Sequence, residues 1–217
     1  MPPFPNNLST DPILAHLASD PVLAPHLNSS HWLESSTTEN VYHRLLRAIC
    51  GQQLSVKAAA TIWQRFVELF GGAPPSPAEL LHTPAERLRG AGLSGQKSGY
   101  VRNIATYFET HPTAAAHWQG LSDEAIIREL TQIKGVGVWT VQMLLLFGLQ
   151  RPDVFPVGDL GIQQGMQQLY GLTATGKALR QRMSAIAEAW RPYRSYASLA
   201  LWRVKDGAGA PSSRSPE

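Results

Sequence analysis

Residues 130–159 place the tightest constraint on what this chain can fold into. They read LTQIKGVGVWTVQMLLLFGLQRPDVFPVGD, which indicates a helix end, a Gly-Val-Gly turn, an apolar second helix and a Pro- and Gly-rich loop ending at Asp159. Two glycines at such a turn permit positive φ and a close approach of the backbone. The amides that open the second helix have no partner within it and can hold a phosphate. The segment therefore predicts a helical hairpin that binds a phosphate, followed by one carboxylate available for chemistry.

The remaining chain has the apolar spacing of helices and no convincing period-two alternation, so we expect an all-α protein of nine or ten helices. Thr38 is expected to cap a helix that begins at Glu39, and Ser55 and Ser122 to open two others. The expected helices also include 12–21, 77–89, 96–108, 138–149, 160–170, 178–190 and one that begins at Pro192 and runs through Val204.

The chain has 217 residues, which is enough for one or two small domains. The formal net charge of +3 hints at an anionic partner, although it also suits any mildly basic protein. Cys50 is the single cysteine, which excludes a disulfide framework, a four-cysteine zinc site and a cysteine-ligated iron–sulfur cluster within one chain. No signal sequence or apolar run of about 18 residues is present, so we expect a cytoplasmic protein, nucleoid-associated if bacterial.

A weaker repeat of the hairpin pattern lies at residues 86–101, ERLRGAGLSGQKSGYV. It also reads helix, Gly-x-Gly turn, helix, and it would place Lys97 near a second phosphate. The alternative is that glycine serves only the geometry of the turn. The pattern alone leaves both readings open.

Five collinear segments together resemble the helix-hairpin-helix DNA glycosylase superfamily, in its AlkA-type 3-methyladenine DNA glycosylase II branch. Besides the hairpin, they are RAICGQQLSVKAAATIW (47–63), LSGQKSGYVRNIA (93–105), DVFPVGDLGI (153–162) and AWRPYRSYASLALWRV (189–204). The resemblance extends from about Val41 to Val204.

The resemblance implies a two-lobed all-α fold with the active site in the cleft between lobes and no extra N-terminal β domain. One lobe would comprise residues 37–151, with the hairpin at about 122–149. The other would comprise 152–204 together with the N-terminal segment 1–36, and residues 205–217 would form a disordered tail.

Asp159 matches the essential aspartate of this family. Breaking a base–sugar bond builds positive charge on the deoxyribose, and a preorganised carboxylate lowers that barrier. The alternative is that Asp159 only caps the helix that follows, and the two roles are compatible. Asp153 competes for the catalytic role but matches the family's structural acid. Arg194, Ser195 and Tyr196 match a segment that buttresses the aspartate, although Arg194 could instead be a solvated side chain.

Trp139 occupies the position at which strand-cutting members of the superfamily carry a lysine. Lys134 precedes the glycines and lies on the wrong side of the turn, so no amine is offered for a Schiff base. The resemblance therefore implies a monofunctional enzyme without lyase activity, which removes a base and leaves the backbone intact.

The base pocket implied by the resemblance contains Trp139, Trp202 and Met143. Electron-rich ring faces attract cationic alkylated purines. Met143 stands where the family often has tyrosine, which suggests a softer pocket and leaves the substrate range open. The alternative for both tryptophans is an ordinary role in the core.

The DNA contacts implied by the resemblance lie at two interhelix turns. The DNA backbone would be bound by four hairpin residues and by Lys97 of segment 86–101. The hairpin residues are Gly135, Val136, Gly137 and Thr140. Gln53 or Leu54 would enter the stack when the base is extruded, and the alternative there is a plain polar turn. A structural monovalent or divalent ion could bind the carbonyls of Thr131, Ile133 and Val136, without a catalytic cofactor.

We therefore expect a monofunctional DNA glycosylase that flips alkylated purines, such as 3-methyladenine or 7-methylguanine, out of duplex DNA and hydrolyses their N-glycosidic bond. The product would be an abasic site for base excision repair. We expect a monomer whose partner is damaged duplex DNA and that does not bind a membrane. Two alternatives stay open: the same fold acting on hypoxanthine, ethenoadenine or oxidised bases, and a non-catalytic DNA-binding module.

Overall fold

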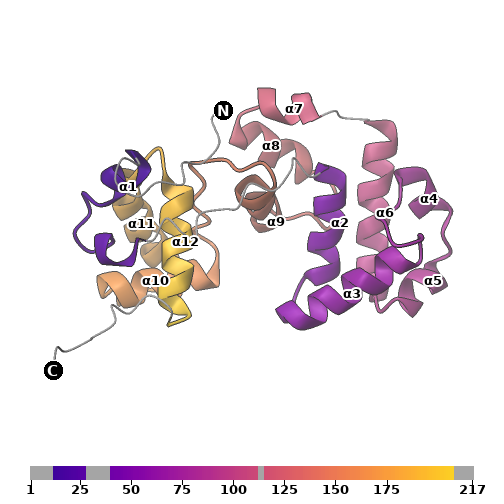
Figure 1. Ribbon diagram of the computed structural model, residues 1–217, viewed down its shortest axis with the longest axis horizontal. Helices are drawn as coiled ribbons and strands as arrows, with labels where there is room; N and C mark the ends of the chain where they lie inside the picture. The colour runs from indigo at the N-terminus through magenta and orange to yellow at the C-terminus, as the bar shows by residue number, and fades with distance from the viewer. Residues whose placement is uncertain (1–11, 28–39, 112–114, 208–217) are drawn as a thin grey trace. The chain divides into compact units, whose positions relative to one another are not determined.

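The computed structural model describes residues 12–27, 40–111 and 115–207, and within these ranges it contains helices and no strand (Figure 1). The predicted all-α class is therefore confirmed. None of the described helices has both the length and the apolar character needed to cross a membrane. The chain divides into two compact units: unit 1 combines residues 1–36 with 150–217, and unit 2 comprises residues 37–149.

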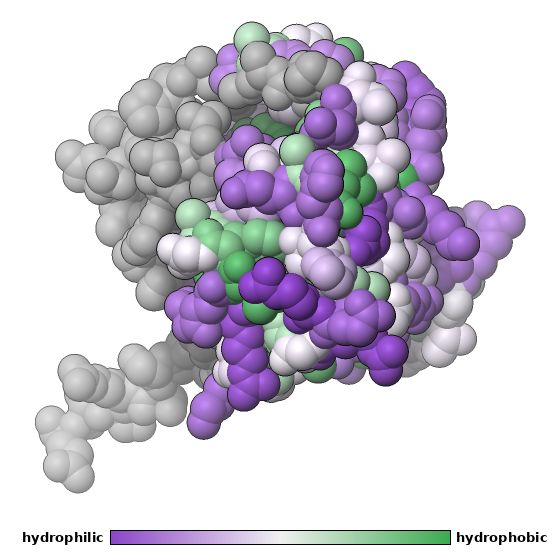
Figure 2. Space-filling view, turned by 90° about the vertical axis from the view of Figure 1, so that its right-hand side faces the viewer, coloured by the Kyte–Doolittle hydropathy of each residue, from purple (hydrophilic) through white to green (hydrophobic). Residues whose placement is uncertain are grey.

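Unit 2 is built around α2 and α6, which pack against each other, while α3 packs on α2 and α4 on α6 (Figure 1). The elements are α2 (Val41–Gly51), α3 (Val56–Glu68), α4 (Pro77–His82), α5 (Ala85–Gly90), α6 (Gly95–Thr110), α7 (Ala115–Gly120), α8 (Asp123–Leu130), α9 (Val138–Met143) and the π-helical turn η3 (Leu144–Gly148). Their apolar faces supply a core that includes Leu45, Ile49, Ile104 and Ile126, all fully buried. The side of unit 2 seen in Figure 2 carries mostly hydrophilic side chains with a few hydrophobic ones among them.

Unit 1 is built around α10 and α12, which pack closely together. Its elements are α1 (Pro12–Leu17), η1 (Ala24–His26), α10 (Leu160–Tyr170), α11 (Gly176–Ala187), η4 (Glu188–Trp190) and α12 (Arg194–Lys205). Glycine permits the close approach: a Cβ at Gly165 would lie 2.5 Å from the Leu201 carbonyl oxygen. The core of the unit joins the N-terminal segment to these helices through Leu17, Leu23 and Met183.

Asp20 ties that N-terminal segment to the unit. Its Oδ1 accepts from the amides of Val22 (2.9 Å) and Leu23 (3.1 Å), and its Oδ2 from the Tyr170 hydroxyl (2.8 Å) and the Trp190 indole (2.9 Å). Burial alone would raise the pKa of this carboxyl, but the hydrogen bonds outweigh it and the pKa of Asp20 is lowered.

Several predicted helix boundaries need correction. The cap of α2 is Asn40, whose side chain accepts from the Tyr42 amide at 2.9 Å, and the helix begins at Val41 rather than at Glu39; Thr38 lies outside the described residues. The predicted helix 77–89 is two helices, because Pro84 cannot donate the amide that a continuous helix requires. The helix α7 was not predicted, and α12 begins at Arg194 rather than at Pro192.

Caps formed by local side chains agree with the prediction. The Ser55 and Ser122 hydroxyls accept from the amides three residues on, which opens α3 and α8 as expected. The apolar helix predicted at 138–149 begins at Val138 as expected but changes to π-helical geometry from Leu144 to Gly148.

Candidate functional site

Asp159 is held at the N-terminus of α10. Its Oδ1 accepts from the Ile162 amide at 2.9 Å and from the Trp202 indole N–H at 2.8 Å, while its own amide donates to the Pro156 carbonyl at 2.8 Å. The side chain is half-buried, between exposed Gly158 and Leu160. The helix-capping interpretation of Asp159 is therefore confirmed. It does not compete with a catalytic role, because capping places the carboxylate at the start of α10.

The loop that carries Asp159 is fastened to the start of α12. Ser195 is 1% exposed; its hydroxyl accepts from the Val154 amide at 2.9 Å and donates to the Arg151 carbonyl at 2.5 Å. Its amide donates to the Pro152 carbonyl at 3.0 Å. A segment without helical hydrogen bonds of its own is thus satisfied by one buried serine.

Asp153 is engaged in ion pairs at the same junction. Its Oδ1 lies 2.6 Å from Nε of Arg194, and its Oδ2 lies 2.8 Å from Nη1 of Arg191. The Arg194 side chain is only 16% exposed, so the alternative of a solvated arginine is wrong. Asp153 holds the loop to α12, which agrees with its expected structural role.

The Gly-Val-Gly hairpin is supported from α6 and from the end of α2. Gly135 has φ of +106°, and a Cβ there would lie 2.3 Å from the Tyr100 ring. The Asn103 side chain donates to the Lys134 carbonyl at 3.0 Å, and the Gln52 side chain reaches the Gly135 carbonyl at 3.5 Å. Glycine is therefore required at position 135 by both its backbone conformation and its neighbour.

Side chains of the hairpin divide sharply by exposure. Ile133 and Val136 are buried, and Thr140 is only 3% exposed. Val138 and Trp139 are 51% and 46% exposed. Because the side chains of Val136 and Thr140 are buried, their predicted DNA contacts would be made by backbone atoms. The predicted pocket residue Met143 is half-buried at the end of α9.

The predicted wedge lies at the tight turn between α2 and α3. Gln53 has φ of +58° and an exposed side chain, and Leu54 is 42% exposed. The Lys97 ammonium donates to the carbonyls of Cys50 (2.9 Å) and Gln52 (2.8 Å), which caps the C-terminus of α2. Lys97 thus has a structural role that the sequence did not indicate, and its contact with phosphate stays a prediction.

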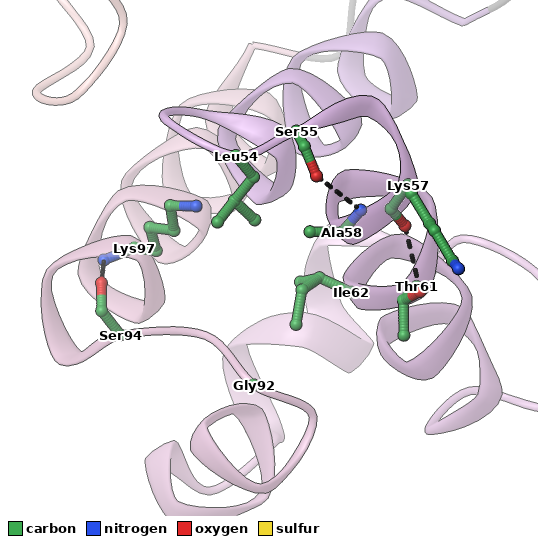
Figure 3. Close-up of a pocket in the computed structure, with 9 residues that line it drawn as sticks. All are labelled: Leu54, Ser55, Lys57, Ala58, Thr61, Ile62, Gly92, Ser94 and Lys97. Carbon is green, nitrogen blue, oxygen red and sulfur yellow. Dashed lines mark hydrogen bonds between the residues drawn. The ribbon is translucent and has the colours of Figure 1, made fainter.

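A cavity of about 560 Å³ adjoins this turn in unit 2. Leu54, Ala58 and Ile62 supply its apolar walls, and the remaining lining residues are Ser55, Lys57, Thr61, Gly92, Ser94 and Lys97. Figure 3 shows Lys57 pointing away from the centre of this group. Leu54 therefore lines a hollow on one side while part of its side chain meets solvent.

Exposed large apolar side chains mark the predicted functional elements. Among the described residues they are Val22, Leu54, Val138, Trp139 and Leu160. Leu54 belongs to the predicted wedge, Val138 and Trp139 follow the hairpin, and Leu160 follows Asp159. Val22 belongs to none of the predicted functional elements.

Cys50 and a metal ion would be two other sources of chemistry among the described residues. Burial raises the pKa of the Cys50 thiol to about 12, so at neutral pH the thiol is protonated and a poor nucleophile. Within the described ranges no three His, Cys, Asp or Glu side chains are grouped so that they could hold a metal ion. At the hairpin, the Ile133 carbonyl already accepts from the Val136 amide at 2.9 Å. An ion at the carbonyls of Thr131, Ile133 and Val136 stays a prediction.

Two supports of the site were missed by sequence reasoning. The Trp202 indole reaches Asp159 from α12, and Gly161 leaves the space for that contact, because a Cβ at Gly161 would lie 2.7 Å from Cδ1 of Trp202. Tyr100 packs under Gly135 in the same way. Gly161, two residues after the aspartate in a helical segment, was the one available signal. The stacking role expected for Trp202 stays a prediction.

Comparisons with known proteins agree with this arrangement. Residues 46–192 match the HhH-GPD superfamily of base excision DNA repair proteins. DNA-3-methyladenine glycosylase 1 of Schizosaccharomyces pombe is 38% identical over 166 residues, which cover 75% of this chain and 72% of that protein. The YfjP protein of Bacillus subtilis is 34% identical over 170 residues; the match covers 76% of this chain but only 58% of that relative's length.

A solved structure shows the same fold. The S. pombe 3-methyladenine DNA glycosylase in complex with abasic DNA superposes with a TM-score of 0.80 at 31% identity, covering 92% of this chain and 99% of that one. The family match spans both the Gly-Val-Gly hairpin and the loop that carries Asp159. This chain belongs to the HhH-GPD superfamily.

Proposed function

We propose that the protein is a monofunctional DNA glycosylase that hydrolyses the N-glycosidic bond of alkylated purines in duplex DNA. The observation that carries this proposal is the carboxylate of Asp159, held by the Ile162 amide and the Trp202 indole in a segment that matches the family. The names of relatives, DNA-3-methyladenine glycosylases, support the choice of alkylated bases.

The reaction would proceed through a sugar that carries positive charge. As the bond between base and C1′ lengthens, the carboxylate of Asp159 stabilises the oxocarbenium-like transition state. A water then adds to C1′ and gives up its proton, which leaves an abasic site. A 3-methyl- or 7-methylpurine is cationic and departs as a neutral base, so strong acid catalysis is unnecessary.

Recognition of the base is assigned to Trp139. Its ring is 46% exposed at the start of α9, where it can stack on a cationic base by a cation–π contact. Trp139 also occupies the position at which a Schiff-base lysine would be needed. Lys134 lies on the other side of the glycines, where its carbonyl accepts from the Asn103 side chain. We therefore propose that the enzyme leaves the DNA strand uncut.

Binding of DNA is assigned to the two turns of unit 2. The hairpin presents the backbone at Gly135–Gly137 to a phosphate, and Gln53 or Leu54 fills the stack when the base leaves. Both wedge candidates are exposed, as insertion requires.

The test is single-turnover base release from a duplex that contains one 3-methyladenine. Wild type, Asp159→Asn and Glu86→Gln are compared, since Glu86 is an exposed acid of α5 and its change removes the same charge. Abasic sites are revealed by alkali, and an untreated lane detects direct strand cutting. We expect release by wild type and Glu86→Gln, almost none by Asp159→Asn, and no cutting in the untreated lane.

Other outcomes redirect the assignment. If wild type binds the duplex without releasing 3-methyladenine, the substrate assignment is wrong, and a panel of hypoxanthine, ethenoadenine and oxidised bases is tested next. If that panel is also untouched, the protein is a DNA-binding module. Cutting in the untreated lane would contradict the monofunctional mechanism.

A further inference from the structure

We propose that the indole N–H of Trp202 positions the catalytic carboxylate of Asp159, so that Trp202 acts on the reaction through Asp159. This inference rests on the proposed function and adds a role to a residue that the family resemblance assigns to stacking. The observation is a hydrogen bond of 2.8 Å between Nε1 of Trp202 and Oδ1 of Asp159, across 43 residues of sequence.

Two donors to Asp159, the Ile162 amide and the Trp202 indole, come from different elements. The Ile162 amide lies one turn into α10, and the Trp202 indole projects from α12; both donate to Oδ1. A single capping amide leaves the carboxylate able to rotate about its side-chain bonds. A second donor from a separately anchored helix restricts that rotation, and such preorganisation is what an electrostatic role in the transition state requires.

The packing of α10 on α12 leaves room for this bond. A Cβ at Gly161 would lie 2.7 Å from Cδ1 and 3.0 Å from Nε1 of Trp202, and 3.1 Å from Oδ1 of Asp159. All three atoms belong to the two side chains that form the hydrogen bond, Trp202 and Asp159. A methyl group at position 161 would therefore press on both partners of the hydrogen bond and move one of them.

The same unit contains a matched bond away from Asp159. Trp190 donates its indole N–H to Oδ2 of Asp20 at 2.9 Å, and Asp20 binds the N-terminal segment. Trp190→Phe removes an equivalent indole-to-carboxylate bond from the core of unit 1. It separates a general loss of stability from an effect on the reaction.

The experiment measures single-turnover release of 3-methyladenine and the dissociation constant for an abasic-site duplex. Trp202→Phe keeps an aromatic ring and removes the N–H, and 3-benzothienylalanine at position 202 keeps the shape of the indole with sulfur in place of N–H. Removing a hydrogen bond to a charged group should slow release roughly 10- to 100-fold. We expect both variants to show that loss with duplex affinity changed less than about twofold, and Trp190→Phe to keep the wild-type rate.

Two further variants test whether the effect passes through Asp159. In the Asp159→Asn background, Trp202→Phe should cause no additional loss, which is the signature of a coupled pair. Gly161→Ala should slow release with the tryptophan intact. Gly99→Ala of α6, where a Cβ meets nothing within 4 Å, should not.

The outcomes separate this inference from the function on which it rests. If wild type releases base and the N–H-free variants are as fast, or if their losses add to that of Asp159→Asn, the positioning role is wrong while the glycosylase stands. A loss confined to affinity for the abasic-site duplex would also overturn it, because Trp202 would then act on DNA binding and not on the reaction. If wild type releases no base at all, the proposed function fails and this role fails with it.

Discussion

The Asp159 loop of unit 1 and the hairpin of unit 2 belong to the same proposed reaction, yet they are built in opposite ways. The loop is held by side chains: Ser195, Arg194 and Trp202 each bind it through hydrogen bonds. The hairpin keeps its side-chain support underneath, at Tyr100 and Asn103, and turns Val138 and Trp139 outward.

The difference follows from what each element is asked to do. A carboxylate that stabilises developing charge must be fixed before the reaction, so its loop is cross-linked by polar contacts. An element that binds a duplex without reading its sequence works through backbone amides and apolar surface, and these must stay exposed. Substitutions in the loop should therefore affect the rate, and substitutions of the hairpin glycines should affect DNA binding.

The largest effect is expected at the carboxylate itself. Asp159→Asn keeps an oxygen that can cap α10 but removes the charge, so release should fall by roughly 1000-fold or more. Its affinity for an abasic-site duplex should stay within about twofold of wild type, as measured by fluorescence anisotropy. An equal loss of rate and affinity would break the division between the two regions.

The next effect is expected at the hairpin glycines. Gly135→Ala combines φ of +106° with a Cβ 2.3 Å from the Tyr100 ring, so the turn must shift. We expect duplex affinity to fall roughly 10-fold or more and stability to fall by about 1–3 kcal/mol. Gly99→Ala of α6 is the matched control, because a Cβ there meets nothing within 4 Å and Gly99 is not among the residues assigned to DNA contact. Equal losses in the two variants would refute this account.

A smaller effect, on one class of base, is expected at Trp139. Because the ring is 46% exposed, Trp139→Leu should leave the melting temperature nearly unchanged. Loss of a desolvated cation–π contact should slow release of 3-methyladenine roughly 10-fold. Neutral hypoxanthine, if it is a substrate, should be affected less; an equal effect on both bases would argue against recognition of the positive charge.

The smallest effect concerns stability and pH in unit 1. The pKa of Asp20 is lowered in the folded state, so its contribution is present above its unfolded pKa of about 3.9 and is lost as pH falls through the folded pKa. Asp20→Asn should destabilise the protein by about 1–2 kcal/mol at pH 7 and by less at pH 3. Urea unfolding between pH 3 and 7 measures this difference, and a constant deficit across that range would contradict it.

Local signals account for the features that were predicted correctly. The all-α class follows from apolar spacing, and the caps at Ser55 and Ser122 follow from a hydroxyl placed three residues before an amide. The cap at Asp159 follows from its place just before a helix, whereas its choice over Asp153 as the catalytic acid rests on the resemblance to the family. Pro84 is also a local signal. Proline is tolerated at the start of a helix but not in its interior, so it marks the boundary between α4 and α5.

The supports of the site depend on residues far apart in the chain. Trp202 meets Asp159, Ser195 meets Val154, and Lys97 meets Cys50 across 43, 41 and 47 residues. No spacing rule links such pairs, because helix packing rather than chain connectivity brings them together. For Lys97 the sequence suggested a phosphate contact, which stays a prediction, and it did not indicate the two carbonyls to which the ammonium donates.

By itself, the sequence determined that this protein is helical, that its hairpin requires glycine, and that a loop with two carboxylates, Asp153 and Asp159, follows the hairpin. These properties depend on backbone sterics and on side chains within a few residues of each other. Only the tertiary structure decided that the carboxylate is held by an indole from α12 and that Gly161 leaves the space for it. Those contacts exist because α10 and α12 pack closely, and close packing depends on the shapes of both helices at once.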